Sequence, residues 1–442
     1  MQMNKRIIAG IDIGSSKVTT IIASVPETGL TNVMGVATNN SRGIRKGQIV
    51  DIEDATQSVV KSLEAAERMA GYSISSAFLS IGGAHISSQN SHGVVAVAEP
   101  NKEITPEDVS RAVDAARAVS LASTREILHV VPREFIVDSQ EGIKDPVGMT
   151  GVRLEVNTHL ITAGSTALKN LEKCASLVGI DVDGFVFNGL ASASSVLTET
   201  EKELGVVLVD LGAGTMDICI FIDGALAYSS VLPIGARNIT NDLAIGLRVS
   251  LESAEKIKLM LNQKNNKPAL PEKNQFEHLL TTKKEKPKET SDDDIDISSL
   301  SLPEGVYKVS RKTLVEGIIK PRLNEIFTMV GLEIKKSGFG GLTPAGIVVC
   351  GGGAETMGIL EAAKRNLAMQ VRLGRPSNLS GLIDEIGHPA YSTAAGLVLY
   401  GVKSDVSGKE KFSIGKLSKY VDAMPVQGVV KKVVDLVKSF LP

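Results

Sequence analysis

Two short segments of this chain place an aspartate, glycine and a hydroxyl in the same order. Residues 12–16 read DIGSS and residues 210–215 read DLGAGT, each directly after an apolar run. Glycine lets the backbone approach a phosphate, the turn amides and hydroxyl can donate to its oxygens, and the aspartate can hold hydrated Mg²⁺. Two such turns facing each other would grip a triphosphate from both sides. Either segment alone could be a plain β-hairpin, and the repetition favours the phosphate site.

A third segment, 346–356, reads GIVVCGGGAET, an apolar run followed by three glycines and a helix start. Open glycines at such a junction let a flat ligand come close, and a helix N-terminus favours negative charge. Alone this is a weak signal. Met357, just after it, could cap a base or fill the core.

The elements that must position these segments are also repeated. Residues 1–25 predict strand, tight turn and strand, and a second copy begins near residue 205, which predicts two homologous half-domains. A helix is expected over 55–71, with Gly71 positioned to end it. Between 83 and 162 the pattern changes to a small α+β insertion, in which Thr105 as N-cap, Pro106 and Asp108 mark a helix start.

Composition limits the class of protein. The 442 residues are 43% hydrophobic and 22% charged, which is typical of α/β proteins and excludes wholesale disorder. Their formal charge of −2 gives no overall field toward nucleic acid, so none is expected as a partner. Neither a signal peptide nor an apolar run of ~20 residues is apparent, which predicts a cytosolic protein unless something attaches it to a surface.

The cysteines and histidines show no metal-ligand spacing. We interpret the cysteines as buried, reduced thiols and the histidines as packed or exposed structural residues rather than catalysts. The residues interpreted in this way are all three cysteines, Cys174, Cys219 and Cys350, and five of the six histidines, His85, His92, His129, His159 and His388.

Two polar stretches separate the expected globular parts. Residues 262–303 are proline-containing and dense in both charge signs, which predicts a mobile surface loop because such a segment buries too little apolar surface to offset its ordering entropy. Residues 403–425 are expected to form a flexible linker.

The last segment, 426–442, predicts an amphipathic helix about 25 Å long, too short and too charged on one side to cross a bilayer. Lys431, Lys432 and Lys438 lie opposite the apolar stripe and suit an anionic lipid surface. The alternative, docking on the protein's own body, is disfavoured by the polar linker before it. The apolar stripe comprises Val426, Val429, Val430, Val433, Val434, Leu436, Val437, Phe440 and Leu441.

The order of the three glycine segments resembles the actin, sugar kinase and heat-shock chaperone superfamily. Within it the chain is similar to the FtsA family of bacterial cell-division proteins, most clearly at 125–156, 187–205 and 309–319. The resemblance covers nearly the whole chain except 262–303. It implies an actin-like, two-lobed α/β fold of duplicated ribonuclease H-like domains with a small α+β insertion.

The resemblance also implies residues that bind ATP and Mg²⁺. Asp12 and Asp210 would hold the ion through water. The first loop would comprise Asp12, Gly14, Ser15, Ser16 and Lys17, the second Asp210, Gly212, Ala213, Gly214 and Thr215, and the adenosine segment Gly351, Gly352, Gly353 and Ala354. Gly235, Glu255 and Lys258 match positions near the ribose and base, although an exposed helix face would also explain the last two.

Two positions depart from the family pattern. Ala213 stands where many relatives have glycine, which is tolerable at negative φ. Asn188 stands where a glutamine or glutamate would orient the attacking water. Because this amide is shorter and cannot act as a base, we expect ATP hydrolysis to be slow or negligible, and no catalytic residue is assigned.

The implied domains are a first lobe (1–82, 163–190 and 381–402), the insertion (83–162), and a second lobe (191–380) that contains a subdomain at 236–320. The implied partners are the C-terminal tail of FtsZ at that subdomain, further copies of the chain in filaments, anionic lipids and other division proteins. We therefore interpret the chain as a peripheral adaptor at the division septum that tethers the FtsZ ring to the cytoplasmic face of the membrane. A pilus-assembly scaffold and, less favoured, a small-molecule kinase are the alternatives.

Overall fold

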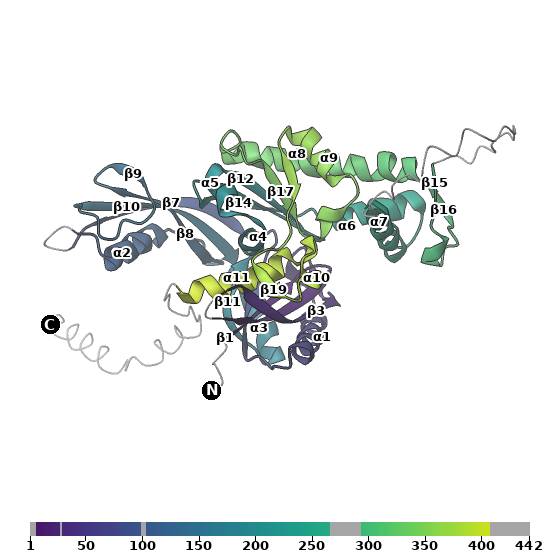
Figure 1. Cartoon of the computed structure of the whole chain (residues 1–442), viewed down its shortest axis with the longest axis horizontal. Helices are drawn as coiled ribbons and strands as arrows, with labels where there is room; N and C mark the ends of the chain where they lie inside the picture. The colour runs from purple at the N-terminus through teal and green to yellow at the C-terminus, as the bar shows by residue number, and fades with distance from the viewer. Residues whose placement is uncertain (1–5, 27–28, 99–102, 266–292, 407–442) are drawn as a thin grey trace, which may run out of the picture.

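The first lobe is built on a six-stranded sheet. The computed structural model describes residues 6–26, 29–98, 103–265 and 293–406. Helices α1 (Ile52–Ala70) and α3 (Ser165–Val178) pack together beside this sheet, whereas α11 (Ser392–Val406) packs on β1, β2 and β6 (Figure 1). The strand order is β11 (Asp181–Phe187), β6 (Ser76–Ile81), β1 (Arg6–Ile13), β2 (Lys17–Val25), β3 (Thr31–Asn40) and β19 (Leu379–Gly381).

The second lobe repeats this topology. Strands β1 to β3 form an antiparallel meander continued by parallel β6 and β11, and β12 to β14 form the same meander continued by parallel β17 and β18. The expected duplicated, actin-like α/β architecture is therefore confirmed. The order is β14 (Ala225–Leu232), β13 (Met216–Ile222), β12 (Val206–Leu211), β17 (Ile347–Cys350) and β18 (Val371–Leu373), with α8 (Lys320–Ser337) and α9 (Ile359–Leu367) packed together over it.

An α+β insertion leaves the first lobe after β6. Its antiparallel sheet has the order β7 (Ser87–Ala96), β10 (Arg153–Gly164), β8 (Arg125–Val137) and β9 (Gln140–Ile143), and α2 (Pro106–Arg117) packs on β7 and β10. The expected helix start is present, because Thr105 and Asp108 form a reciprocal capping box. Although the insertion branches from the first lobe, it lies against β14 of the second, where Ser88 Oγ donates to the Ser229 carbonyl at 2.6 Å.

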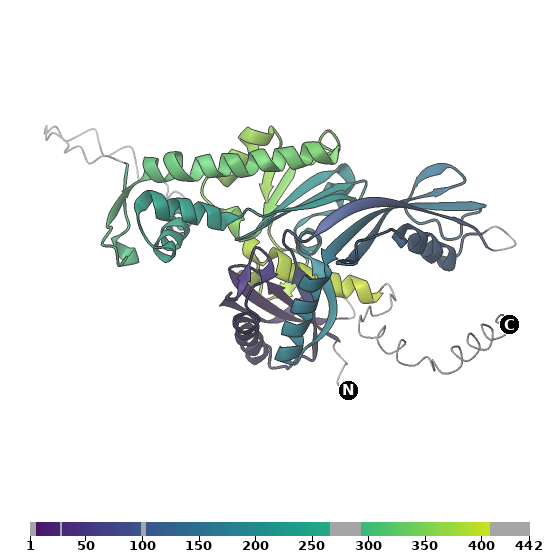
Figure 2. The same ribbon diagram turned by 180° about the vertical axis from the view of Figure 1, so that it is seen from behind.

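A helical subdomain extends from the opposite end of the second lobe, as both views show (Figures 1 and 2). It comprises α6 (Ala236–Leu247), α7 (Leu251–Asn265), β15 (Asp294–Asp296), the turn η1 (Ser298–Leu300), β16 (Lys308–Ser310) and the π-helical η2 (Thr313–Ile319). The prediction of one mobile loop over 262–303 is wrong at both ends, since α7 continues to Asn265 and β15 pairs with β16. Ile297 and Leu302 supply the apolar burial that the charged composition obscured.

Two helices connect the lobes. Helix α4 (Asn188–Val196) packs on α11, and α5 (Glu199–Leu204) follows α4 into the second lobe. The predicted lobe boundary at 190/191 therefore falls inside α4, and the linker expected from 403 begins within α11. The remaining elements are β4 (Ile44–Arg45), β5 (Gln48–Ile49), η3 (Gly352–Glu355), α10 (Ile383–Ile386) and η4 (Pro389–Tyr391).

The predicted amphipathic helix at 426–442 and most of the linker lie outside the described residues. None of the helices described here has the length and apolarity that a bilayer-spanning segment needs.

Candidate nucleotide site

The first loop lies at the end of β1. The Gly14 amide donates to the Lys17 carbonyl at 3.0 Å and closes the turn. The buried Asp12 carboxylate accepts a hydrogen bond from Ser80 Oγ at 2.8 Å, a partner supplied by the parallel neighbour β6. Ser15 is buried and accepts from the Gly47 amide at 2.9 Å, whereas Ser16 is exposed.

The second loop repeats this geometry at the end of β12. The Gly212 amide donates to the Thr215 carbonyl at 3.0 Å, and Thr215 is buried. The buried Asp210 carboxylate accepts hydrogen bonds from Ser192 of α4 and, at 3.0 Å, from Thr393 of α11. Ala213 is absent from the described residues that have positive φ, so its backbone does not require glycine.

The two loops face each other across the lobes. A Cβ atom on Gly214 would lie 3.1 Å from Ser15 Oγ, and Arg237 at the start of α6 donates to the Ser15 carbonyl at 3.4 Å. No acceptor in the described part of the chain bonds the backbone amides of Ser15, Ser16, Ala213 or Gly214. Opposed turns with unbonded amides provide the donors that a polyphosphate needs.

The glycine-rich third segment packs directly on the second loop. Gly351 has φ +84°, and a Cβ atom there would lie 2.2 Å from Asp210 Oδ1, so only glycine fits. Gly352, Gly353 and Ala354 follow in η3, a 3₁₀ turn where a helix start was expected. Met357 is buried in the core of the second lobe, which favours the core-filling interpretation.

Three further predicted residues lie near α6. Gly235 packs on the second loop, because a Cβ atom there would lie 2.5 Å from the Ala213 carbonyl oxygen. Lys258 is buried and donates to Thr240 Oγ1 at 2.9 Å and to Glu255 Oε2 at 2.7 Å. The alternative of an exposed helix face is therefore wrong for Lys258, whereas the side chain of Glu255, its ion-pair partner, is 43% exposed.

Sequence reasoning missed Asp217, which lies opposite Asp210 in the β12–β13 pair. Its side chain is 2% exposed, and Oδ1 has no hydrogen-bond partner in the part of the chain described. An aspartate inside the apolar run MDICIFI was the available signal. Ser80, Ser192, Thr393 and Arg237 were also missed, because nothing in their local sequence indicates contact with the loops.

Burial controls the charge state of this region. Desolvation raises the pKa of Asp12 to about 6 and also raises that of Asp210. It raises the pKa of Asp217 well above its usual value, and the nearby Asp210 and Asp12 carboxylates raise it further. Burial lowers the pKa of Lys17, which both loop aspartates partly counteract. Three buried carboxyls and one ammonium would favour an added cation.

Asn188 begins α4 beside Gly82, and its Oδ1 is a buried atom without a hydrogen-bond partner among the described residues. An unpaired amide oxygen next to the first lobe's sheet is suited to receive a water or ligand donor. Slow hydrolysis stays a prediction.

The buried histidines His129 and His159 make hydrogen bonds inside the fold. His129 Nε2 accepts the Phe187 amide proton at 3.0 Å, and the His159 ring bridges Asn90 at 2.7 Å and Ser229 at 2.9 Å. All three cysteines are buried and free.

The residues present fit a nucleotide carrying Mg²⁺. Unbonded turn amides offer donors for phosphate oxygens, and Gly214 leaves room where a side chain would meet Ser15. The described chain contains no ready cluster of three or more His, Cys, Asp or Glu side chains for direct coordination of a metal. A hydrated ion held through its waters by Asp12 and Asp210 is compatible with that arrangement.

Solved structures share this fold. The chain is similar to a chain of the PilM-PilN type IV pilus biogenesis complex, with a TM-score of 0.60 and 12% identity over 89% of this chain and 98% of that one. It is also similar to MreB5 of Spiroplasma citri bound to ADP, with a TM-score of 0.50 and 12% identity over 91% and 99% of the two chains. At these identities the likeness concerns the fold alone.

Sequence comparisons are more specific. Residues 83–162 match the family model "SHS2 domain inserted in FTSA", and residues 207–396 match "Cell division protein FtsA". The cell division protein FtsA of Pseudomonas aeruginosa is 40% identical over 91% of both chains. That of Escherichia coli is 37% identical over 92% of this chain and 93% of its own. The chain therefore belongs to the FtsA family of cell division proteins.

Proposed function

We propose that this chain binds ATP, forms polymers and tethers the FtsZ ring to the inner face of the cell membrane during bacterial cell division. The observation that carries the proposal is the pair of matching turns, at 12–16 and 210–215, that face each other in a member of this family. The membrane, FtsZ and filament parts of the proposal depend on family membership and on the sequence of the tail.

ATP with Mg²⁺ is the ligand that this geometry supports best. The turn amides would bind the phosphates, Lys17 would add a positive charge, and Gly351 to Gly353 would lie against the adenosine. Asp12 and Asp210 would hold the hydrated ion, whose charge offsets the repulsion between phosphates and buried carboxyls. Asn188 would support only slow hydrolysis, because an amide cannot accept the proton of an attacking water.

Nucleotide affinity of conservative variants tests this part. Asp12→Asn and Asp210→Asn keep the side-chain shape but remove the charge, so each should weaken ATP binding with Mg²⁺ by about tenfold or more in calorimetry. Asp384→Asn, at an exposed position in α10, is the matched control and should bind like the parent chain. A parent chain without measurable affinity for adenine nucleotides would overturn the proposal.

Polymer formation follows from a body with two different contact faces. Closure of the lobes on ATP would favour head-to-tail packing, a heterologous contact that does not close and so extends into filaments. The insertion at 83–162 would contribute to that contact, and the subdomain at 236–320 would bind the FtsZ tail. Sedimentation with and without ATP, followed by titration with an FtsZ tail peptide, measures both activities.

Membrane attachment is assigned to residues 426–442. One such helix would bind weakly, because helix ordering offsets much of the ~1.5 to 3 kcal/mol that each large apolar side chain contributes, and several on one polymer would bind strongly. Co-sedimentation with anionic liposomes should therefore pellet the full chain more efficiently than a chain ending at Met424. Equal pelleting of the two would contradict the anchor.

A further inference from the structure

A short segment just before α11 lies against both the third loop and the first. His388 Nε2 contacts Glu355 Oε2 at 2.5 Å, and the Gly351 amide donates to the Pro389 carbonyl at 3.1 Å. The same segment ends at Tyr391, whose ring lies against Lys17 of the first loop. The four residues 388–391 therefore connect the proposed adenosine end of the site to its phosphate end.

The Lys17 ammonium has an unusual environment for a lysine. It lies 4.1 Å from the centroid of the Tyr391 ring, a distance at which the negative face of the ring attracts a cation. Asp12 and Asp210 act on it electrostatically, but no ion pair joins Lys17 to a carboxylate within the described residues. The aromatic ring is thus the direct neighbour of this half-buried charge.

We propose that Tyr391 is a positioning residue that holds the Lys17 ammonium between the two loops, ready for a phosphate. The inference rests on the proposed nucleotide site and adds a residue to it. A direct ion pair with Asp12 or Asp210 would use the N–H donors of Lys17 and would occupy carboxylates suited to a metal ion. An aromatic face attracts the charge and leaves most of its donors available to phosphate oxygens.

The position of the ring is fixed from two sides. Tyr391 closes the 3₁₀ turn η4, where its amide donates to the His388 carbonyl at 2.9 Å, and its hydroxyl accepts a long contact of 3.5 Å from Thr38 of β3. Ser392, the first residue of α11, donates to the Pro389 carbonyl at 2.7 Å and secures the other end of the turn. A ring held in this way orders Lys17 before a ligand arrives, which lowers the entropy cost of binding.

Binding of ATP and adenosine to a set of variants of the full chain tests the inference. Tyr391→Leu removes the ring and should weaken ATP binding by about 3- to 30-fold, the range of a cation–π contact, without changing adenosine affinity. Tyr391→Phe keeps the ring and should bind ATP like the parent chain. In a Lys17→Met background, Tyr391→Leu should cause no further loss.

Several results would overturn it. If Tyr391→Leu lowers adenosine affinity together with ATP affinity, the role of Tyr391 is structural. If Tyr391→Phe loses as much ATP affinity as Tyr391→Leu, the effect belongs to the hydroxyl. If Tyr391→Leu still lowers ATP affinity in the Lys17→Met background, Tyr391 does not act through Lys17. A parent chain that binds ATP while Tyr391→Leu binds it equally well refutes this inference alone. A parent chain that binds no ATP refutes the proposed function instead.

A second measurement needs neither ATP nor a folded Tyr391→Leu chain. In protein labelled with ¹³C at the lysine ε position, the Lys17 resonance, identified by its loss in Lys17→Met, should be shifted upfield by the ring current in both the parent and Tyr391→Phe. A Lys17 resonance at the position of exposed lysines would contradict the contact.

Discussion

One methyl group added at Gly396 should separate helix α11 from helix α4. Gly396 lies in α11, and a Cβ atom there would be 1.8 Å from the Ala191 carbonyl oxygen of α4, where contacts shorter than 3.0 Å essentially never occur. The helices would have to part by about 1.2 Å, the difference between these two distances. Because the atom met is backbone, no side-chain rotation can relieve the clash.

The expected cost is worked from this contact. Overpacking typically lowers the free energy of unfolding by ~1 to 3 kcal/mol, and a clash with backbone belongs at the upper end of this range. Replacing glycine by alanine in a helix opposes this loss, because it stabilises the helix by about 1 kcal/mol. Parting α4 from α11 would also strain the hydrogen bonds that Ser192 and Thr393 donate to Asp210, each worth ~1.5 to 3 kcal/mol with a charged acceptor. Gly396→Ala should therefore lower the free energy of unfolding by about 2 to 4 kcal/mol.

Urea denaturation followed by circular dichroism measures the change, since the chain has no tryptophan to report by fluorescence. Gly317→Ala is the matched control, because Gly317 is a helical, exposed glycine with no atom within 4 Å of the added methyl group. The control should be neutral or up to ~1 kcal/mol more stable. If Gly396→Ala proves as stable as that control, the crossing of α4 and α11 is not as tight as argued.

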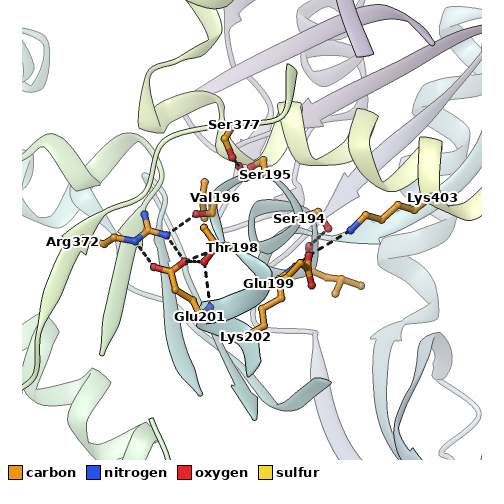
Figure 3. A network of polar contacts seen from close by, with 11 residues as sticks. Ser194, Ser195, Val196, Thr198, Glu199, Glu201, Lys202, Arg372, Ser377 and Lys403 are labelled. Carbon is orange, nitrogen blue, oxygen red and sulfur yellow. Dashed lines mark hydrogen bonds and ion pairs between the residues drawn. The ribbon is translucent and has the colours of Figure 1, made fainter. Parts of the chain in front are cut away.

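Three further predictions concern protonation, the α4–α5 corner and the metal ion. Burial lowers the pKa of His159 from 6.5 to about 4. The unfolded state therefore binds the proton more tightly than the folded state, so the free energy of unfolding decreases as pH falls below 6.5, by about 2 kcal/mol near pH 5. His159→Gln should reduce that loss in urea denaturation at about pH 7.5 and 5, and an unchanged pH slope would contradict the assignment. Arg372 donates to both oxygens of Glu201 and to the Val196 carbonyl at 2.8 Å (Figure 3). Arg372→Ala should therefore lower the free energy of unfolding by about 1 to 2 kcal/mol, after allowance for the partial exposure of the arginine. Arg372→Lys should restore less than half of this loss, since lysine lacks the planar guanidinium. Equal stability of the alanine variant and the parent chain would show that this corner is held by packing alone. Removing Mg²⁺ with EDTA should weaken calorimetric binding of ATP but not of adenosine, because buried carboxyls would then face the phosphates without compensation; equal affinities with and without the ion would refute that reasoning.

The elements that the sequence predicts correctly are those with local signals. Gly71 ends α1 in the left-handed region at φ +64°, and Thr105 caps α2, as neighbouring residues alone indicate. The loop aspartates, too, are recognisable locally, because each follows an apolar strand and precedes a glycine turn. Such features depend on backbone chemistry within a few residues, so they can be read before the fold is known.

The features that were missed depend on residues distant in the sequence. Ser192 and Thr393 meet at Asp210 only because α4 and α11 cross there, and the crossing requires a glycine at 396, where a Cβ atom would meet the backbone of Ala191. No local pattern marks a serine or glycine as part of such a contact. The folded end of the charged loop was missed for a related reason, since its burial depends on a partner strand that begins at Lys308.

The two halves of the site have diverged in charge although their backbones repeat. In the first hairpin Asp12 lies opposite Thr19, whereas in the second Asp210 lies opposite Asp217. The turn-closing carbonyl belongs to Lys17 in one copy and to Thr215 in the other. Two copies of the first half would place two ammonium groups together. Two copies of the second half would place four buried carboxyls together without any ammonium group. The first half thus supplies the ammonium and the second the additional buried acid, so only a chain with both halves places Lys17 beside Asp12, Asp210 and Asp217.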